Sequence, residues 1–527
     1  MAVEAETCFQ SGDSARAADL FHQAVRIDPQ LAGAWLGLGR DAIQNSRHAE
    51  GHRYYLRAIA AADATLLTHP ADYASLISLV TAYYSLALPS EAVASALRAL
   101  AIEPDAELHR SMLGLMSYTP DSTPEAIYEQ ACRWEALHAA PLAASLPPPA
   151  NSPVPGRRLR VGYVSPDLYS HAVAKFVQPV FEHHDRSQFE VFVYAVGSRE
   201  DGCTAAARAA VERFVPFRGK GVELAARIRS DAIDILVDLA GHTMRWEFLQ
   251  AFALRSAPVQ ATWVGMLATT GLSAIDYFIG DSNMPCPGTE HLFREAVYRL
   301  PGVTACYRPA ADAALAPAPC LERGYITFGC YNQPAKINPS VVSLWAAILR
   351  AVPGSRLRLK YAGMESEIFQ GRFQSWFARE GVPRERLEFA GASVAGEYMA
   401  RYGDIDIALD PFPYTGGSTT LDAVSMGVPV VTLVGRTAVQ CCSADILRAV
   451  GLPDTVAQSR EHYIHSALFL AEIVGRIPQL RQNVREAFRR SPFRDEAGFV
   501  RHLEAAFREM WRRWCAGIDP RSLRRAG

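Results

Sequence analysis

The stretch from Leu409 to Leu433, LDPFPYTGGSTTLDAVSMGVPVVTL, places small residues, hydroxyl groups and a carboxylate in an order suited to binding a phosphate. The apolar run before it predicts a buried strand, and the glycines allow a sharp turn into a helix. The first turn of a helix presents free backbone N–H groups and the positive end of the helix dipole, so it attracts anions. The residues expected in this turn are Gly416, Gly417, Ser418, Thr419, Thr420 and Asp422.

The same stretch predicts that the helix stops near Gly427 and that Val430 to Leu433 form the next buried strand. A nucleotide diphosphate is an anion that would suit such a turn. A strand and helix crossover without any ligand also uses small residues in its turn, so the rest of the chain has to decide between the two interpretations.

The composition limits the classes of protein to consider. The chain has 527 residues, 49% of them hydrophobic and 20% charged, which is typical of a globular protein with about three domains. The net charge is −2 and lysine and arginine form only short clusters, so a nucleic-acid-binding surface is not expected. The N-terminus lacks a signal pattern and no apolar run reaches membrane-spanning length. We therefore expect a soluble cytoplasmic protein without a membrane partner.

The ten cysteines are scattered without a CxxC pair, and the adjacent Cys441 and Cys442 cannot readily bridge each other. The pattern indicates neither a disulfide framework nor a zinc site. Reduced thiols are the expectation that follows.

The N-terminal part has the periodicity of tetratricopeptide repeats. Pro70 and Pro104 lie 34 residues apart, and small and large residues recur at matching positions before each proline, as at Ala17, Phe21 and Ala24. About seven extra residues around Thr65 to Pro70 interrupt the period of roughly 34, which we interpret as a loop insertion. Such repeats stack to bury their faces, so they predict a helical solenoid with a groove for acceptor proteins or peptides.

After a proline-rich linker the pattern changes to strands alternating with helices, which is typical of two Rossmann-like lobes with a ligand cleft. We expect domains at 1–138 (repeats), 139–157 (linker), 158–310 (N-terminal lobe), 311–497 (C-terminal lobe, which contains the phosphate-binding turn) and 498–527 (C-terminal helix and tail). The expected strands are Leu159–Val164, Phe189–Val196, Ile233–Leu239, Val259–Val264 and Tyr277–Gly280, then Tyr325–Phe328, Leu357–Tyr361, Leu387–Phe389, Ile405–Leu409 and Val430–Leu433.

The chain resembles the tetratricopeptide-linked protein O-glycosyltransferases, the family of O-GlcNAc transferase and SPINDLY. The matching strings are RVGYVSPDLYSHAV, DILVDLAGHT, LRSAPVQATW, TTGLSAIDY, ITFGCYNQPAKINPSVVSLWAAILRAVPGSRL and LDPFPYTGGSTTLD. They keep the family's order over most of the chain. The resemblance implies an α-helical tetratricopeptide solenoid followed by a GT-B glycosyltransferase, and an inverting transfer of a sugar to serine or threonine hydroxyls.

The resemblance also implies roles for individual residues. His171 matches the family's active-site histidine; imidazole groups titrate near neutrality, so it could accept the acceptor hydroxyl's proton or orient a substrate. Lys336 matches a lysine that would neutralise charge on the leaving diphosphate, with Gln333 donating to the same phosphates. Asp422 matches an aspartate that binds the ribose hydroxyls, and His242 is expected in the cleft. His183 and His184 compete for the role of His171.

We therefore expect a metal-independent protein O-glycosyltransferase that needs no cofactor, with UDP-GlcNAc as the first donor to consider and GDP-fucose as the second. A homo-oligomer is possible. A tetratricopeptide scaffold whose transferase lobes bind a nucleotide without catalysis is the alternative from another class, motivated by Met266, Leu267 and Gly417, which differ from the family pattern. A transferase acting on a glycan or small molecule is a further alternative.

Overall fold

The computed structural model describes residues 2–143, 147–310, 313–394, 396–477 and 479–525. The chain forms two compact units, each discontinuous in sequence. The first unit contains Met1–Asp121, Ala316–Tyr414 and Arg460–Pro478, and the second contains Ser122–Leu315, Thr415–Ser459 and Gln479–Gly527. Part of the predicted linker (144–146) and the predicted lobe boundary at 310/311 fall on or next to residues outside this description.

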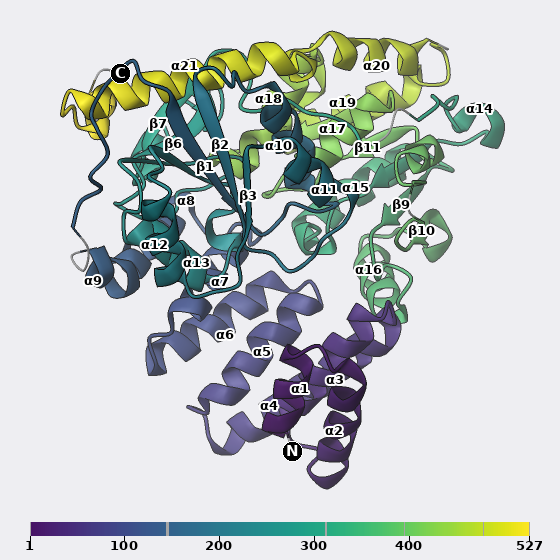
Figure 1. Ribbon diagram of the computed structural model, residues 1–527. Helices are drawn as coiled ribbons and strands as arrows, with labels where there is room; N and C mark the ends of the chain where they lie inside the picture. Colours follow the sequence, from purple (N-terminus) through teal and green to yellow (C-terminus); the bar gives the residue numbers. More distant parts are fainter. Residues whose placement is uncertain (1, 144–146, 311–312, 395, 478, 526–527) are drawn as a thin grey trace. The chain divides into compact units, whose positions relative to one another are not determined.

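The first unit begins with seven helices that pack in sequence order, each against the next (Figure 1). They are α1 (Ala2–Gln10), α2 (Ser14–Ile27), α3 (Ala32–Gln44), α4 (His48–Thr68), α5 (Tyr73–Ser85), α6 (Pro89–Ile102) and α7 (Ala106–Met116). Aspartates whose side chains accept a backbone N–H begin α2, α5 and α7, which fixes the starts of these helices.

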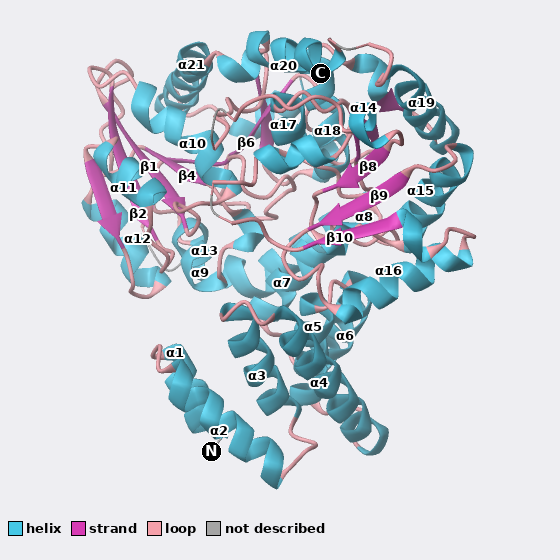
Figure 2. Cartoon of the chain, turned by 90° about the vertical axis from the view of Figure 1, so that its right-hand side faces the viewer, coloured by secondary structure: helices cyan, strands magenta, loops and turns pink. Residues whose placement is uncertain are grey.

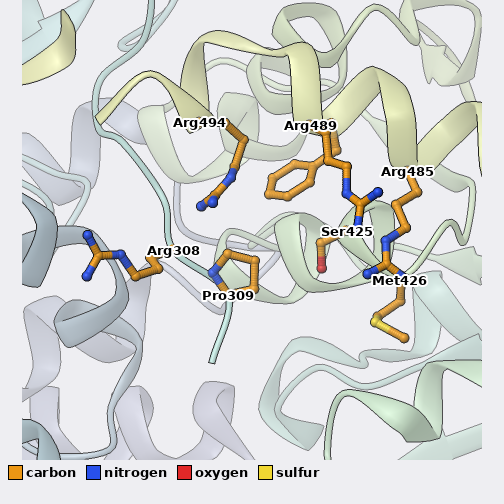
Figure 3. A pocket seen from close by; sticks show the side chains of 8 residues that line it. Arg308, Pro309, Ser425, Met426, Arg485, Arg489 and Arg494 are labelled. Atoms are coloured by element: carbon orange, nitrogen blue, oxygen red, sulfur yellow. The ribbon is translucent and has the colours of Figure 1, made fainter. Parts of the chain in front are cut away.

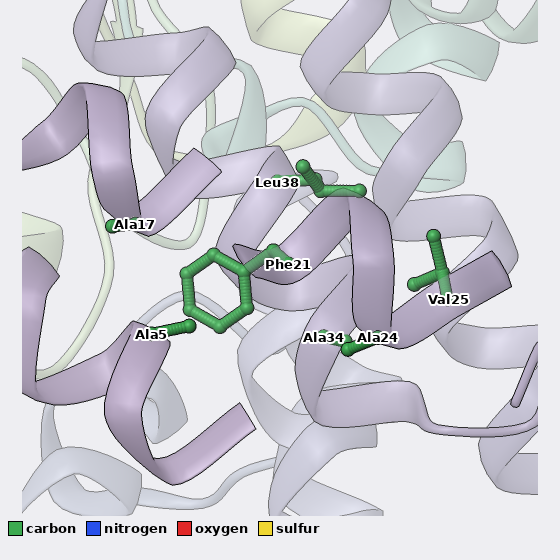
Figure 4. Close-up of a cluster of buried hydrophobic side chains, with 7 residues drawn as sticks. All are labelled: Ala5, Ala17, Phe21, Ala24, Val25, Ala34 and Leu38. Atoms are coloured by element: carbon green, nitrogen blue, oxygen red, sulfur yellow. The ribbon is translucent and has the colours of Figure 1, made fainter. Parts of the chain in front are cut away.

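Small residues in the repeats make room for large ones, as the sequence predicted. The ring of Phe21 lies in a cluster with Ala5, Ala17 and Leu38 (Figure 4). A Cβ added to Gly37 would lie 2.4 Å from that ring, so only glycine lets α3 approach it this closely. The expected loop insertion between the repeats is wrong: α4 runs through these residues to Thr68, because alanine and leucine, both strong helix formers, dominate the segment.

Four parallel strands of the first unit follow the helices. They are β8 (Thr327–Cys330), β9 (Arg356–Lys360), β10 (Leu387–Ala390) and β11 (Ile407–Leu409), in the order β10-β9-β8-β11. The helices of this part are α14 (Cys320–Arg323), α15 (Pro339–Ala351), α16 (Glu367–Arg379) and α19 (Arg460–Ile473). Each strand confirms a prediction to within two residues at either end.

The second unit contains a seven-stranded parallel sheet in the order β3-β2-β1-β4-β5-β6-β7. Figure 2 labels β1, β2, β4 and β6 of this sheet. The strands are β1 (Leu159–Ser165), β2 (Phe189–Ala195), β3 (Arg213–Pro216), β4 (Ile235–Asp238), β5 (Val259–Thr262), β6 (Tyr277–Asp281) and β7 (Ala296–Leu300). The strands β3 and β7 were not predicted from the sequence. Both are edge strands with partly exposed residues, so neither is a continuous apolar run.

The helices of the second unit connect and cover its strands. They are α8 (Pro124–Trp134), a π-helix (Glu135–Ala139), α9 (Ala140–Ala143), α10 (Ala172–His183), α11 (Gly202–Ala209), α12 (Gly221–Ser230), α13 (Trp246–Ala253), α17 (Ser418–Ser425), α18 (Ala438–Val450), α20 (Leu480–Arg490) and α21 (Glu496–Cys515). Two further parallel strands, β12 (Val430–Leu433) and β13 (Val456–Ala457), pair with each other, and β13 was not predicted.

The C-terminal helix α21 packs against β5 and β7 of the seven-stranded sheet. Phe499 stacks on Trp263 with 5.8 Å between ring centroids, and the indole nitrogen of Trp511 donates to the carbonyl of Val154 at 3.1 Å. None of the helices in the described part of the chain combines the length and apolar character needed to span a bilayer.

One cysteine pair corrects the expectation of reduced thiols. Cys286 and Cys441 form a disulfide with 6.5 Å between their Cα atoms, while the other eight cysteines are free. The two residues are 155 positions apart, so no local spacing in the sequence indicates the pairing. The bridge ties the loop after β6 to α18 inside the second unit.

Candidate active site

In the first unit, Lys336 and Gln333 follow the carboxyl end of β8, in a short 3-10 turn (Pro334–Lys336). The ammonium of Lys336 donates to Asn332 Oδ1 at 3.1 Å and lies 4.3 Å from the ring centroid of Tyr414. Tyr414 follows β11, which is the direct neighbour of β8 in the sheet. Adjacent strands of a parallel sheet thus bring these groups together at the carboxyl ends of the strands, where such sheets bind ligands.

Tyr118 joins this cluster from the end of the helical repeats. Its hydroxyl donates to Gln333 Oε1 at 3.1 Å, and its ring stacks on that of Tyr414 with 4.6 Å between centroids. The sequence patterns did not predict a part for Asn332, Tyr118 or Tyr414 in the site. Tyr414 lies inside the quoted LDPFPY string and could have been found there, whereas no local pattern connects Tyr118 with Gln333.

In the second unit, the glycine-rich turn leads into α17 as predicted, with Gly417 as the N-cap residue. Glycine has no side chain to accept the N–H groups of the first helical turn, and the backbone N–H of Thr420 donates to the Gly417 carbonyl at 3.1 Å. Gly417, Ser418 and Thr419 are partly exposed, while Gly416 and Thr420 are buried. The hydroxyl of Thr420 shares a 2.7 Å hydrogen bond with Ser443 of α18, so this residue anchors the turn.

The glycine-rich turn does not use left-handed backbone at Gly417. Gly417 has a negative φ of −127°, so it does not use the left-handed region. That region occurs after the helix, at Gly427 with φ +71°, where an added Cβ would lie 2.3 Å from the carbonyl oxygen of Arg481. A glycine is therefore required where α17 ends.

The expectation that Asp422 lies in the first turn of α17 is wrong. It is the fifth residue of the helix, and its side chain is only 1% exposed. Lys175 Nζ donates to both carboxylate oxygens, at 2.8 and 3.0 Å, and the Tyr307 hydroxyl donates to one of them. A ribose contact, which the resemblance implied, would have to share this carboxylate. Lys175 lies on α10 one helical turn beyond His171, so the string HAVAK could have drawn attention to it.

His171 is the N-cap residue of α10 and follows the carboxyl end of β1. Its Nδ1 accepts the backbone N–H of Val173 at 3.3 Å, so in the neutral ring the proton is on Nε2. Its side chain is 39% exposed, and Asp167 Oδ2 lies 4.0 Å from Nδ1. Burial raises the pKa of Asp167, and the nearby imidazole opposes that shift. In this arrangement His171 presents an N–H donor to solvent.

His242 follows β4, the neighbour of β1, but its side chain is enclosed. Nε2 donates to the carbonyl of Thr270 at 2.7 Å, and the ring packs edge-on against Trp134 with 4.7 Å between centroids. His184, a competitor for the catalytic role, is also buried, between the Tyr163 hydroxyl and Glu504, and burial lowers its pKa. The structure therefore gives both histidines packing contacts, whereas the side chains of His171 and of the other competitor, His183, are 39% and 40% exposed.

A basic cavity of about 250 Å³ lies at the other end of α17 (Figure 3). Arg308, Arg485, Arg489 and Arg494 line it beside Ser425 and Met426. Glu496 pairs with Arg308 and Arg494. Burial works to raise the pKa of Glu496, but the hydrogen bonds and charge of Arg308 outweigh it and lower that pKa. This cavity is distinct from the expected phosphate site, which lies at the glycine-rich turn.

Parallel Rossmann-like sheets after an N-terminal helical region, with cationic and amide donors at their strand ends, define a GT-B glycosyltransferase. The model of glycosyl transferase family 41 matches residues 107–299 and 320–503. The chain belongs to this family, which confirms the resemblance seen in the sequence.

Individual relatives agree with this assignment. A tomato (Solanum lycopersicum) protein described as a probable UDP-N-acetylglucosamine–peptide N-acetylglucosaminyltransferase, SPINDLY, is 37% identical over 436 residues, 81% of this chain and 46% of that protein. The Arabidopsis thaliana protein SEC, described with the same activity, is 28% identical over 410 residues, 74% of this chain and 42% of that protein. The chain thus spans less than half the length of these relatives.

A solved structure matches the chain over nearly its whole length. It is a lysine-to-methionine variant of the Thermobaculum terrenum O-GlcNAc transferase, with a TM-score of 0.88 and 34% identity. The match covers 98% of this chain and 97% of that one.

Proposed function

We propose that this chain transfers N-acetylglucosamine from UDP-GlcNAc to serine or threonine hydroxyls of proteins, with inversion at the anomeric carbon. The observation that carries the proposal is the Lys336 ammonium, held at the end of β8 by Asn332 and the Tyr414 ring. A cation fixed in this way stabilises negative charge that develops on a leaving diphosphate. The names of the relatives support the donor and the peptide acceptor.

In the proposed reaction, the acceptor hydroxyl oxygen forms a bond to the anomeric carbon and releases its proton to water, while the bond from that carbon to the diphosphate breaks. The diphosphate keeps the electron pair, and the Lys336 ammonium and the Gln333 amide would bind it. We propose that His171 orients a substrate oxygen through Nε2–H, because its Nδ1 is already occupied by the N–H of Val173. The helical repeats would hold the acceptor protein.

Calorimetric titration with UDP, GDP, UDP-GlcNAc and GDP-fucose tests the proposal, with wild type and Lys336→Met compared. We expect uridine nucleotides to bind and the variant to bind them at least about tenfold more weakly, as a lost charge-assisted contact of 1.5–3 kcal/mol implies. Lys220→Met, which removes an exposed lysine, serves as the control.

The titration, together with an assay of sugar transfer to protein acceptors, separates the alternatives. A preference for GDP and GDP-fucose would replace the GlcNAc donor with fucose. Binding without turnover of any donor on protein acceptors would favour the scaffold, and no binding of either nucleotide would overturn the proposal.

A further inference from the structure

Tyr118 lies at the end of the helical repeats in the sequence, but its side chain contacts residues of the candidate donor site around Gln333 and Lys336. It lies two residues beyond the end of α7, and its hydroxyl bonds to Gln333, which is 215 residues further along the chain. Its ring stacks on Tyr414, the residue that faces the Lys336 ammonium. All four residues lie in the first compact unit.

The hydrogen bond from Tyr118 sets the orientation of the Gln333 side chain. Because the hydroxyl donates to Oε1, the amide nitrogen and its two hydrogens point away from the tyrosine. An amide turned this way presents donors, which suit phosphate oxygens, instead of a carbonyl oxygen, which repels them. Burial, and next the neighbouring Tyr414, Tyr84 and Tyr361, raise the pKa of Tyr118, so the hydroxyl keeps its proton at neutral pH.

The stacked rings support the second donor group. Tyr118 and Tyr414 are nearly parallel, with an interplanar angle of 25°. Tyr414 in turn lies beneath the ammonium of Lys336 at 4.3 Å, a cation–π distance. A side chain that fixes the ring of Tyr414 therefore also fixes the surface on which the lysine lies.

We propose that Tyr118 is a positioning residue for the donor diphosphate, supplied by the helical repeats, which holds Gln333 and Tyr414 in the orientation that binds phosphate. The proposal rests on the proposed function, because it needs a nucleotide diphosphate at Gln333 and Lys336. It gives the repeats a part in donor binding in addition to their expected part in acceptor binding.

Tyr118→Phe tests the proposal because it removes the hydroxyl and keeps the ring. We expect calorimetry to show UDP binding about 3- to 10-fold weaker than in wild type, the range of one hydrogen bond, and the KM for the donor to rise more than kcat falls. Tyr118→Leu, which removes the stack as well, should weaken binding further. Tyr54→Phe is the matched control, since it removes a hydroxyl that donates to Glu50 at 2.9 Å elsewhere in the repeats; we expect no change.

A double-mutant cycle with Gln333→Leu distinguishes positioning from general stability. If Tyr118 acts through Gln333, Tyr118→Phe should have no further effect on UDP affinity once the amide is absent. Equal weakening in both backgrounds, or wild-type affinity in Tyr118→Phe, would overturn the inference and leave the proposed function standing. If the wild-type protein binds neither UDP nor GDP, both the inference about Tyr118 and the proposed function are overturned.

Discussion

The ion pair between Lys175 and Asp422 permits a quantitative prediction. Lys175→Met keeps the length of the side chain but leaves the Asp422 carboxylate, which is 1% exposed, with Tyr307 as its remaining donor among the contacts described above. Removing one partner of a buried ion pair costs about 3–5 kcal/mol. Lys175 is 18% exposed, so water can partly replace it, and we expect the lower end, about 3 kcal/mol.

Hydrogen exchange followed by mass spectrometry measures this effect locally. In the absence of nucleotide, amides of α10 and α17 should exchange about 100-fold faster in Lys175→Met, since about 1.4 kcal/mol corresponds to a factor of ten. Lys220→Met removes an exposed lysine and should leave exchange in both helices unchanged.

The double variant Lys175→Met with Asp422→Asn provides the decisive comparison. It has no buried charge left without a partner, so it should recover much of the lost protection. The reasoning is refuted if Lys175→Met exchanges within about twofold of wild type, or if the losses of the two single variants simply add.

Two further predictions concern the junction between β6 and α18. Burial, and next the charge of Asp281, raise the pKa of Asp445 to about 8, so the folded state holds a proton that the unfolded chain releases near pH 4. The contribution of this group to the free energy of unfolding is complete below about pH 4. It decreases as the pH rises towards 8, by at most about 1.4 kcal/mol per pH unit. In thermal unfolding at pH 5 and pH 8, Asp445→Asn should therefore lose less stability than wild type, and equal losses would contradict this. Reduction of the bridge between Cys286 and Cys441 should cost about 2–4 kcal/mol, because the bridge closes a long loop. A reductant should then lower the unfolding midpoint of wild type and of the control Cys203→Ser but not of Cys441→Ser; a similar response of all three would count against it.

Local patterns in the sequence determined the class of fold. Buried strands such as Leu159–Ser165 and Val430–Leu433 are mostly apolar runs, and the start of α17 at Ser418 follows from two adjacent glycines. Such signals lie within a few residues of one another, so they can be recognised without knowing what packs against them. The edge strand Arg213–Pro216 has no fully buried residue, so its sequence lacks the apolar run that predicts a strand.

The tertiary structure alone decided which side chains meet. Asp422 finds its cation on Lys175, 247 residues away, and the orientation of Gln333 depends on Tyr118, 215 residues away. The sequence around a carboxylate on a helix does not show whether that carboxylate binds a ribose, interacts with the helix dipole or pairs with a lysine. Its partner is set by how separate elements pack, and that depends on contacts between distant segments, which no local pattern records.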